Sequence, residues 1–221
     1  MGLFGKKKEE EPEPIPLLDP VEPPISVFPN MTRDRQVSLE YRQKLMTMKT
    51  EDFTVFDSDN DEPIVTVTGP AMYARKFKTV TLPNGEPLFK MRVKLAAVNL
   101  RIICEDAERG TEFFQINREW AWKVKLNLRQ NLTVGDSPTL HLVGSAGGSQ
   151  AKVTLKDSGQ LVAVLDRVRW GKEGMQNKLT YRMAVAPGVD LALITALCLA
   201  WDKAKEDDRK RAAAASSGGG G

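Results

Sequence analysis

The stretch that decides the fold is LALITALCLAW, from Leu191 to Trp201, which contains no charged side chain. A helix that is apolar on every side must be buried all round, and this one has only about half of the roughly 20 residues that a bilayer span needs. Asp190 suits the N-cap of such a helix, and Lys203 and Lys205 suit the negative end of its dipole. We therefore expect a helix over about 190–205 inside a soluble protein.

The chain of 221 residues has room for one domain with a real core and two tails. Residues 1–35 hold three lysines, an acidic stretch and a proline-rich segment, a composition that predicts a disordered tail. Residues 207–221 are rich in alanine, serine and glycine and predict a second disordered tail. The expected domain is therefore residues 36–206.

No leader of the signal-peptide kind is present, so we expect a cytoplasmic protein. Cys104 and Cys198 have no metal-ligand spacing and are expected to be small buried side chains. No cofactor or metal is predicted. Asp57, Asp59 and Asp61 have the opening spacing of a calcium loop, but Glu62 replaces its obligatory glycine, so we expect a hairpin turn there.

Short strands separated by turn signals fill the region between the tails. The strongest signal is Asn84-Gly85, which supplies the positive φ values of a tight hairpin turn. Residues 36–48 are ambiguous between helix and strand, and a first strand is favoured. No helix is visible before Asp190, so meandering antiparallel pairing is expected in place of strands joined by crossover helices.

A sheet that closes around the apolar helix is the most economical arrangement of these elements, because closure also removes exposed sheet edges. The alternative is a helix that caps an open sheet. That arrangement would leave one polar helical face, and the central turns of this helix show none. The prediction is a mainly β fold, a closed antiparallel barrel around a buried C-terminal helix.

Three stretches resemble the LURP-one-related proteins of the tubby C-terminal-like superfamily. They are residues 53–57 (FTVFD), the hairpin 82–95 (LPNGEPLFKMRVKL) and the ending 181–190 (YRMAVAPGVD) that enters the helix. The resemblance covers about residues 37–205, and it implies a barrel of about a dozen strands with the hydrophobic helix through its centre. The superfamily includes phosphoinositide-binding tubby proteins and phospholipid scramblases. This chain lacks the cysteine cluster and acylated leader of a scramblase.

Positive charge is concentrated in the middle of the chain. Residues 1–70 carry a net −6, residues 71–182 a net +9 and residues 183–221 a net 0. Lys90, Arg92 and Lys94 alternate with apolar residues at the strand period, as do Lys123 and Lys125, so these cations are expected on the outside of a barrel. With Arg167 and Arg169 they form a candidate basic surface for anionic lipid headgroups; the alternative is an ordinary solvated strand face.

The N-terminus offers a second membrane signal. Gly2 followed by Lys6, Lys7 and Lys8 resembles a myristoylated, polybasic terminus. Because Lys6 stands where serine or threonine is required, an unmodified tail is favoured over acylated Gly2.

Catalysis has little support, since His141 is the single histidine and no nucleophile elbow, phosphate loop or metal spacing is present. The expected function is non-enzymatic, peripheral binding to anionic membrane lipid, particularly phosphoinositide. The alternative is a protein-interaction scaffold whose proline-rich tail recruits partners. Nucleic-acid binding is disfavoured, because no recognition motif or basic-aromatic interleaving is present.

Overall fold

The computed structural model describes residues 16–43, 52–69, 78–94, 99–119, 124–130, 140–144, 149–170 and 178–217. These residues form twelve strands and one long helix. The elements are β1 (Val37–Gln43), β2 (Phe53–Asp57), β3 (Glu62–Thr68), β4 (Lys78–Thr81), β5 (Pro87–Val93), β6 (Arg101–Glu105), β7 (Glu112–Arg118), β8 (Val124–Gln130), β9 (Leu140–Gly144), β10 (Gln150–Leu155), β11 (Leu161–Trp170), β12 (Lys178–Val185) and α1 (Leu191–Ser217).

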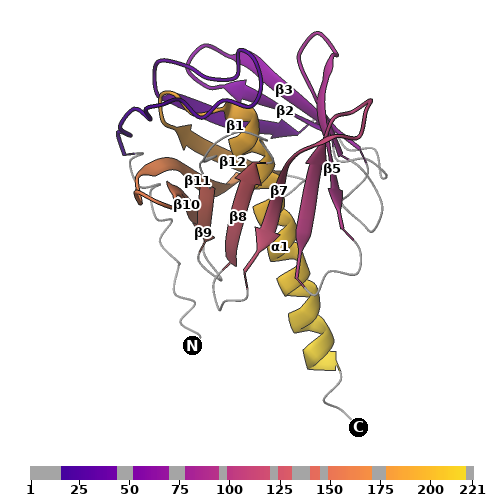
Figure 1. Ribbon diagram of the computed structural model, residues 1–221. Helices are drawn as coiled ribbons and strands as arrows, with labels where there is room; N and C mark the ends of the chain where they lie inside the picture. The colour runs from indigo at the N-terminus through magenta and orange to yellow at the C-terminus, as the bar shows by residue number, and fades with distance from the viewer. Residues whose placement is uncertain are drawn as a thin grey trace.

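Every strand pairs antiparallel with its neighbours in the sequence, which confirms the expected antiparallel, mainly β class. The first strand also pairs with the last, with Leu39 opposite Met183, so the hydrogen-bonded order returns to its start and forms a closed barrel. Helix α1 runs through the ring of strands and projects from one end (Figure 1).

The interior is filled by the apolar part of α1. Every residue from Leu191 to Trp201 is at most 8% exposed, as the uniform apolar run predicted. The strands present alternate side chains to this helix, and Phe89 and Met91 of β5 are both fully buried. The large buried side chains from the wall are Leu39, Phe89, Met91, Ile102, Phe114, Ile116, Leu140, Leu142 and Leu165.

The barrel has two distinct ends. At the entry end, α1 begins at Leu191, and the turns β2–β3, β4–β5, β6–β7 and β10–β11 lie there. At the exit end, α1 leaves the barrel beside the last residues of β7, where Arg118 contacts Asp208.

The second half of the expected N-terminal tail is in fact part of the fold. Residues 16–36, here called the strap, pack across the entry end, and five of their apolar side chains are at most 5% exposed. The prediction of disorder over 1–35 is wrong for this part because apolar residues recur every three or four positions among the prolines. They are Leu18, Val21, Ile25, Phe28 and Met31.

The strap is also joined to the chain just before α1 by backbone hydrogen bonds. The N–H of Val21 donates to the carbonyl of Pro187 (3.0 Å) and that of Ile25 to the carbonyl of Gly188 (2.8 Å). Gly188 has φ +80°, and a Cβ at this position would stand 2.6 Å from the carbonyl oxygen of Val21. Glycine is therefore required both by the backbone conformation and by the close approach of the strap.

Asp190 is the N-cap of α1, as expected. Its Oδ1 accepts hydrogen bonds from the backbone N–H groups of Ala192 (2.9 Å) and Leu193 (3.3 Å), and its Oδ2 accepts from those of Val27 and Phe28 in the strap (both 2.9 Å). One fully buried carboxylate thus satisfies donors of the helix and of the strap.

Helix α1 is longer than expected and ends at Ser217, so the prediction of disorder from residue 207 is wrong as far as that residue. Alanine has the highest helix propensity, and Lys203 pairs with Asp207 (2.6 Å) and Lys210 with Glu206 (2.5 Å) at helical spacing. No helix among the described residues has the length and apolar character needed to cross a membrane.

Candidate lipid-binding surface

Three of the predicted cations lie on β5 or directly after its last residue, but two of them already have partners. The Nζ of Lys90 donates to the carbonyl of Ala107, and the Nε of Arg92 lies 3.1 Å from an oxygen of Glu105 on the neighbouring strand. Lys94 is exposed and makes no ion pair with any described residue. Among these three, the charge of Lys94 is the one most accessible to a ligand.

Arg101 lies directly beside Lys94 and was missed by the sequence reasoning. The backbone N–H of Lys94 donates to the carbonyl of Arg101 (2.8 Å), so the end of β5 and the start of β6 are adjacent. Arg101 is exposed, and it too has no acidic partner in the described part of the chain. Its proximity to Lys94 depends on the hairpin between β5 and β6, which the sequence signalled only weakly.

Arg167 does not belong to the outer surface, and the prediction of its position is wrong. It lies on the same face of β11 as the fully buried Leu165, and its side chain is only 11% exposed. The guanidinium lies 3.7 Å from Asp202 of α1 and 5.9 Å from the ring centre of Tyr181. Arg167 therefore links the barrel wall to the helix inside it.

The inner side of the exit end is lined by aromatic rings and cations. The Nζ of Lys205 lies 4.7 Å from the ring centre of Trp201, and burial, together with the charge of Arg167, lowers the pKa of Lys205. The hydroxyl of Tyr181 donates to Asp202, and burial raises the pKa of that tyrosine. These contacts hold α1 in the barrel.

Arg118 of β7 provides a second link to the helix. Its side chain is 11% exposed, and its Nη1 lies 2.8 Å from Oδ1 of Asp208. Because Asp208 lies beyond the buried run, this ion pair fixes the direction in which α1 leaves the barrel.

The remaining predicted site residues cannot be placed in this surface. Lys125 and Arg169 lie in β8 and β11, but their side chains are outside the described part of the structure. Lys123 and Gly2 lie outside the described residues altogether.

The acidic segment 57–62 forms a hairpin turn, as predicted, and its aspartates pair with arginines. Asp57 is 1% exposed and pairs with Arg35 (2.5 Å), which also contacts Asp59 (3.0 Å). The third carboxylate, Asp61, pairs with Arg42. The hairpin therefore stabilises the entry end through ion pairs.

The family model described as LURP-one-related matches residues 37–202, which is most of the chain. The protein belongs to the LURP-one-related family. The matched region runs from the first residue of β1 to just beyond the buried run of α1, and it excludes the strap and the projecting part of the helix. No curated protein sequence matches the chain.

This LURP-one-related chain is also similar to a protein from Arabidopsis thaliana of known X-ray structure. The two chains are 17% identical, with a TM-score of 0.56 over 80% of this chain and 96% of the other. At this identity the likeness shows a shared fold.

Proposed function

We propose that this LURP-one-related protein is a non-enzymatic, peripheral binder of anionic membrane lipid that meets the cytoplasmic face of a membrane. Phosphoinositides are the preferred lipids, because each headgroup offers several phosphates to one cluster of cations. The observation that supports the proposal is the adjacent pair Lys94 and Arg101, both exposed and both without an acidic partner among the described residues.

The energy of such contacts suits reversible association. Each lysine or arginine near an anionic leaflet contributes about 1 kcal/mol. At moderate ionic strength, salt largely screens the attraction between exposed charges that are more than about 10 Å apart. Lys123, Lys125 and Arg169 remain proposed members of the surface. Lys90 and Arg92 remain as well, with a smaller contribution because their side chains already have partners.

Flotation with vesicles tests the proposal. The purified protein is mixed with vesicles of phosphatidylcholine, alone or with phosphatidylserine or a phosphoinositide, at low and physiological salt. We expect salt-sensitive flotation on the anionic vesicles that is strongest with phosphoinositide and is weakened by K94Q/R101Q. Absence of flotation at low salt on every composition would overturn the proposal and would favour a protein partner.

A further inference from the structure

The projecting part of α1 carries a cluster of cations outside the barrel. Arg209, Lys210 and Arg211 are all exposed, and they follow immediately after Asp208, which is held by Arg118 of β7. Lys210 also pairs with Glu206 one turn earlier. The cluster therefore lies on a helix that is anchored to the barrel wall at its point of exit.

This cluster lies on the same side of the molecule as Lys94 and Arg101. Arg101 is directly opposite Asn117 in the β6–β7 ladder, and Asn117 precedes Arg118, the residue that contacts α1. The backbone hydrogen bond between Lys94 and Arg101 adds β5 to this group. We call these five cations the exit patch: Lys94, Arg101, Arg209, Lys210 and Arg211.

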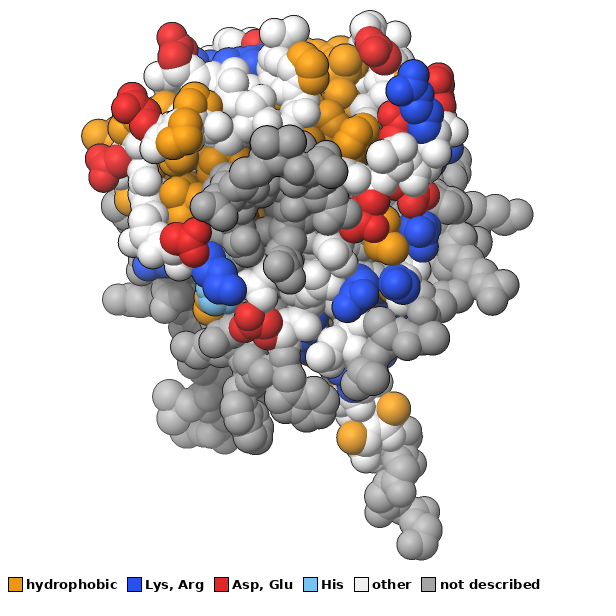
Figure 2. Space-filling view, viewed as in Figure 1, with side chains coloured by type: hydrophobic (Ala, Val, Ile, Leu, Met, Phe, Trp, Pro, Cys, Tyr) orange, Lys and Arg blue, Asp and Glu red, His pale blue; other side chains and the backbone are white. Residues whose placement is uncertain are grey.

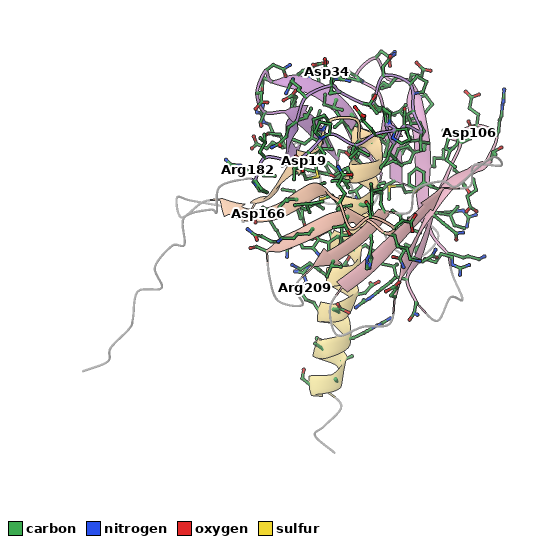
Figure 3. All side chains as sticks on the ribbon, turned by 60° about the vertical axis from the view of Figure 1, so that its left-hand side comes forward. Asp19, Asp34, Asp106, Asp166, Arg182 and Arg209 are labelled. Carbon is green, nitrogen blue, oxygen red and sulfur yellow. The ribbon has the colours of Figure 1, made fainter. Side chains whose placement is uncertain are left out.

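The entry end has the opposite charge. Its turns contain many carboxylates, and Figure 3 shows Asp34 and Asp106 at this end, with Arg209 on α1 at the other. In Figure 2 acidic side chains predominate around the entry end, while basic ones gather where α1 leaves the barrel. The acidic residues of the described turns and of the strand ends beside them are Asp57, Asp59, Asp61, Glu62, Glu86, Glu105, Asp106, Glu108, Glu112 and Asp157, of which Asp57, Asp59, Asp61, Glu62 and Glu105 are paired with arginines.

We propose that this charge asymmetry orients the protein, so that the exit end faces an anionic membrane and the projecting turns of α1 lie against the lipid headgroups. The inference rests on the proposed lipid binding and names its surface. The membrane attracts the exit patch and repels the acidic entry end. Both electrostatic forces act before the protein touches the membrane, so both favour this orientation.

Two matched double variants test the contribution of α1. R209Q/R211Q removes two exposed cations from the exit patch and leaves the ion-paired Lys210 in place. R109Q/K156Q removes two exposed cations from turns at the entry end, so both variants change the net charge equally. At about 1 kcal/mol per cation, R209Q/R211Q should weaken binding to phosphatidylserine or phosphoinositide vesicles roughly thirtyfold. R109Q/K156Q should change it less than twofold.

Orientation is measured separately with an environment-sensitive dye on a single introduced cysteine. S216C places the dye on the projecting helix and S158C in the β10–β11 turn at the entry end, while the two native cysteines are buried. We expect anionic vesicles to shift the emission of the dye at residue 216 and to leave that at residue 158 unchanged.

The outcomes separate the two proposals. If the unaltered protein does not float, lipid binding itself is wrong. If it floats but R209Q/R211Q binds as well as R109Q/K156Q, or the dye at residue 158 responds as strongly as that at 216, lipid binding stands and the orientation is wrong. Binding to single-stranded RNA that is weakened in R209Q/R211Q, together with absence of flotation on anionic vesicles, would assign the exit patch to nucleic acid and would overturn the membrane interpretation.

Discussion

The backbone N–H of Phe28 donates a hydrogen bond of 2.9 Å to the carboxylate of Asp190, 162 residues further along the chain. This contact joins the strap to the N-terminus of the central helix. The same carboxylate caps the first turn of α1, so one side chain fixes the strap against the start of the helix. Several measurable properties depend on these contacts.

D190N should destabilise the protein by about 2–3 kcal/mol, because its amide group would place donors against the N–H groups of the strap and leave them unpaired. Burial raises the pKa of Asp190 above its ordinary value of 3.8, although its backbone hydrogen bonds oppose the shift. The folded state then binds this proton more tightly than the unfolded chain. The contribution of Asp190 to the free energy of unfolding is therefore complete below pH 3.8 and is lost as the pH rises through the pKa of Asp190 in the folded protein.

Urea unfolding of D190N and of the unaltered protein, at a series of pH values from below 3.8 upwards, measures both the destabilisation by D190N and its dependence on pH. We expect the difference in free energy of unfolding to be largest at acidic pH and to narrow as the pH rises, since asparagine does not ionise. A difference that widens with rising pH would show that the carboxylate is stabilised in its ionised form.

G188A should destabilise the fold by about 2–4 kcal/mol, because alanine is strained at φ +80° and its Cβ would stand 2.6 Å from the carbonyl of Val21. The strap would have to move away from the entry end. Amide hydrogen exchange provides the local readout: the N–H groups of Val21 and Ile25 should lose protection more than those of β5. Uniform loss of protection across the molecule would contradict a local displacement of the strap.

G144A should also be destabilising, for a steric reason. A Cβ at residue 144 would lie 2.5 Å from Nε1 of Trp201, and that indole is fully buried. Overpacking of this kind typically costs about 1–3 kcal/mol. Combining G144A with W201F removes the obstructing part of the ring, so the cost of G144A in the W201F background should be smaller. Equal costs in both backgrounds, measured by thermal or urea unfolding, would exclude this contact as the cause.

R167M should leave vesicle binding unchanged, because Arg167 faces the inside of the barrel. R167M leaves Asp202 without this cation, and because Asp202 is 47% exposed the free energy of unfolding should fall by only about 1–3 kcal/mol. Flotation and urea unfolding measure the two properties on the same sample. A loss of lipid binding as large as that of K94Q/R101Q would return Arg167 to the lipid-binding surface.

K90Q/R92Q should weaken vesicle binding less than K94Q/R101Q, although both remove two cations. Lys90 already donates to Ala107 and Arg92 is paired with Glu105, whereas Lys94 and Arg101 have no such partners among the described residues. Co-sedimentation over a series of salt concentrations compares the variants. Equal losses would mean that charge count, and not the availability of each side chain, controls binding.

The buried run from Leu191 to Trp201 could be predicted because every position is apolar or small, so no choice of helical face was needed. The Asn84-Gly85 turn and the N-cap at Asp190 were equally local signals. The LURP-one-related resemblance supplied the number of strands, and the family match confirms that resemblance over residues 37–202.

Other features depend on contacts that a linear pattern does not contain. The strap looks like a disordered proline-rich tail because its apolar residues are buried only by a surface built much later in the chain. Residues 161–165 are apolar on both faces of β11. The alternation of apolar and polar side chains therefore could not predict that Arg167 lies on the inner face. Arg101 became part of the candidate surface only through its pairing with β5.

The position of α1 in the chain has a consequence for biosynthesis. The helix that fills the barrel is translated after all the strands that surround it, and the ring closes between the first strand and the last. Until Leu191–Trp201 emerge from the ribosome, the nascent sheet has no filler for its apolar inner face. Incomplete chains of this kind expose aggregation-prone surface. Folding should therefore be largely post-translational and should depend on chaperones that hold the strands until the last helix arrives.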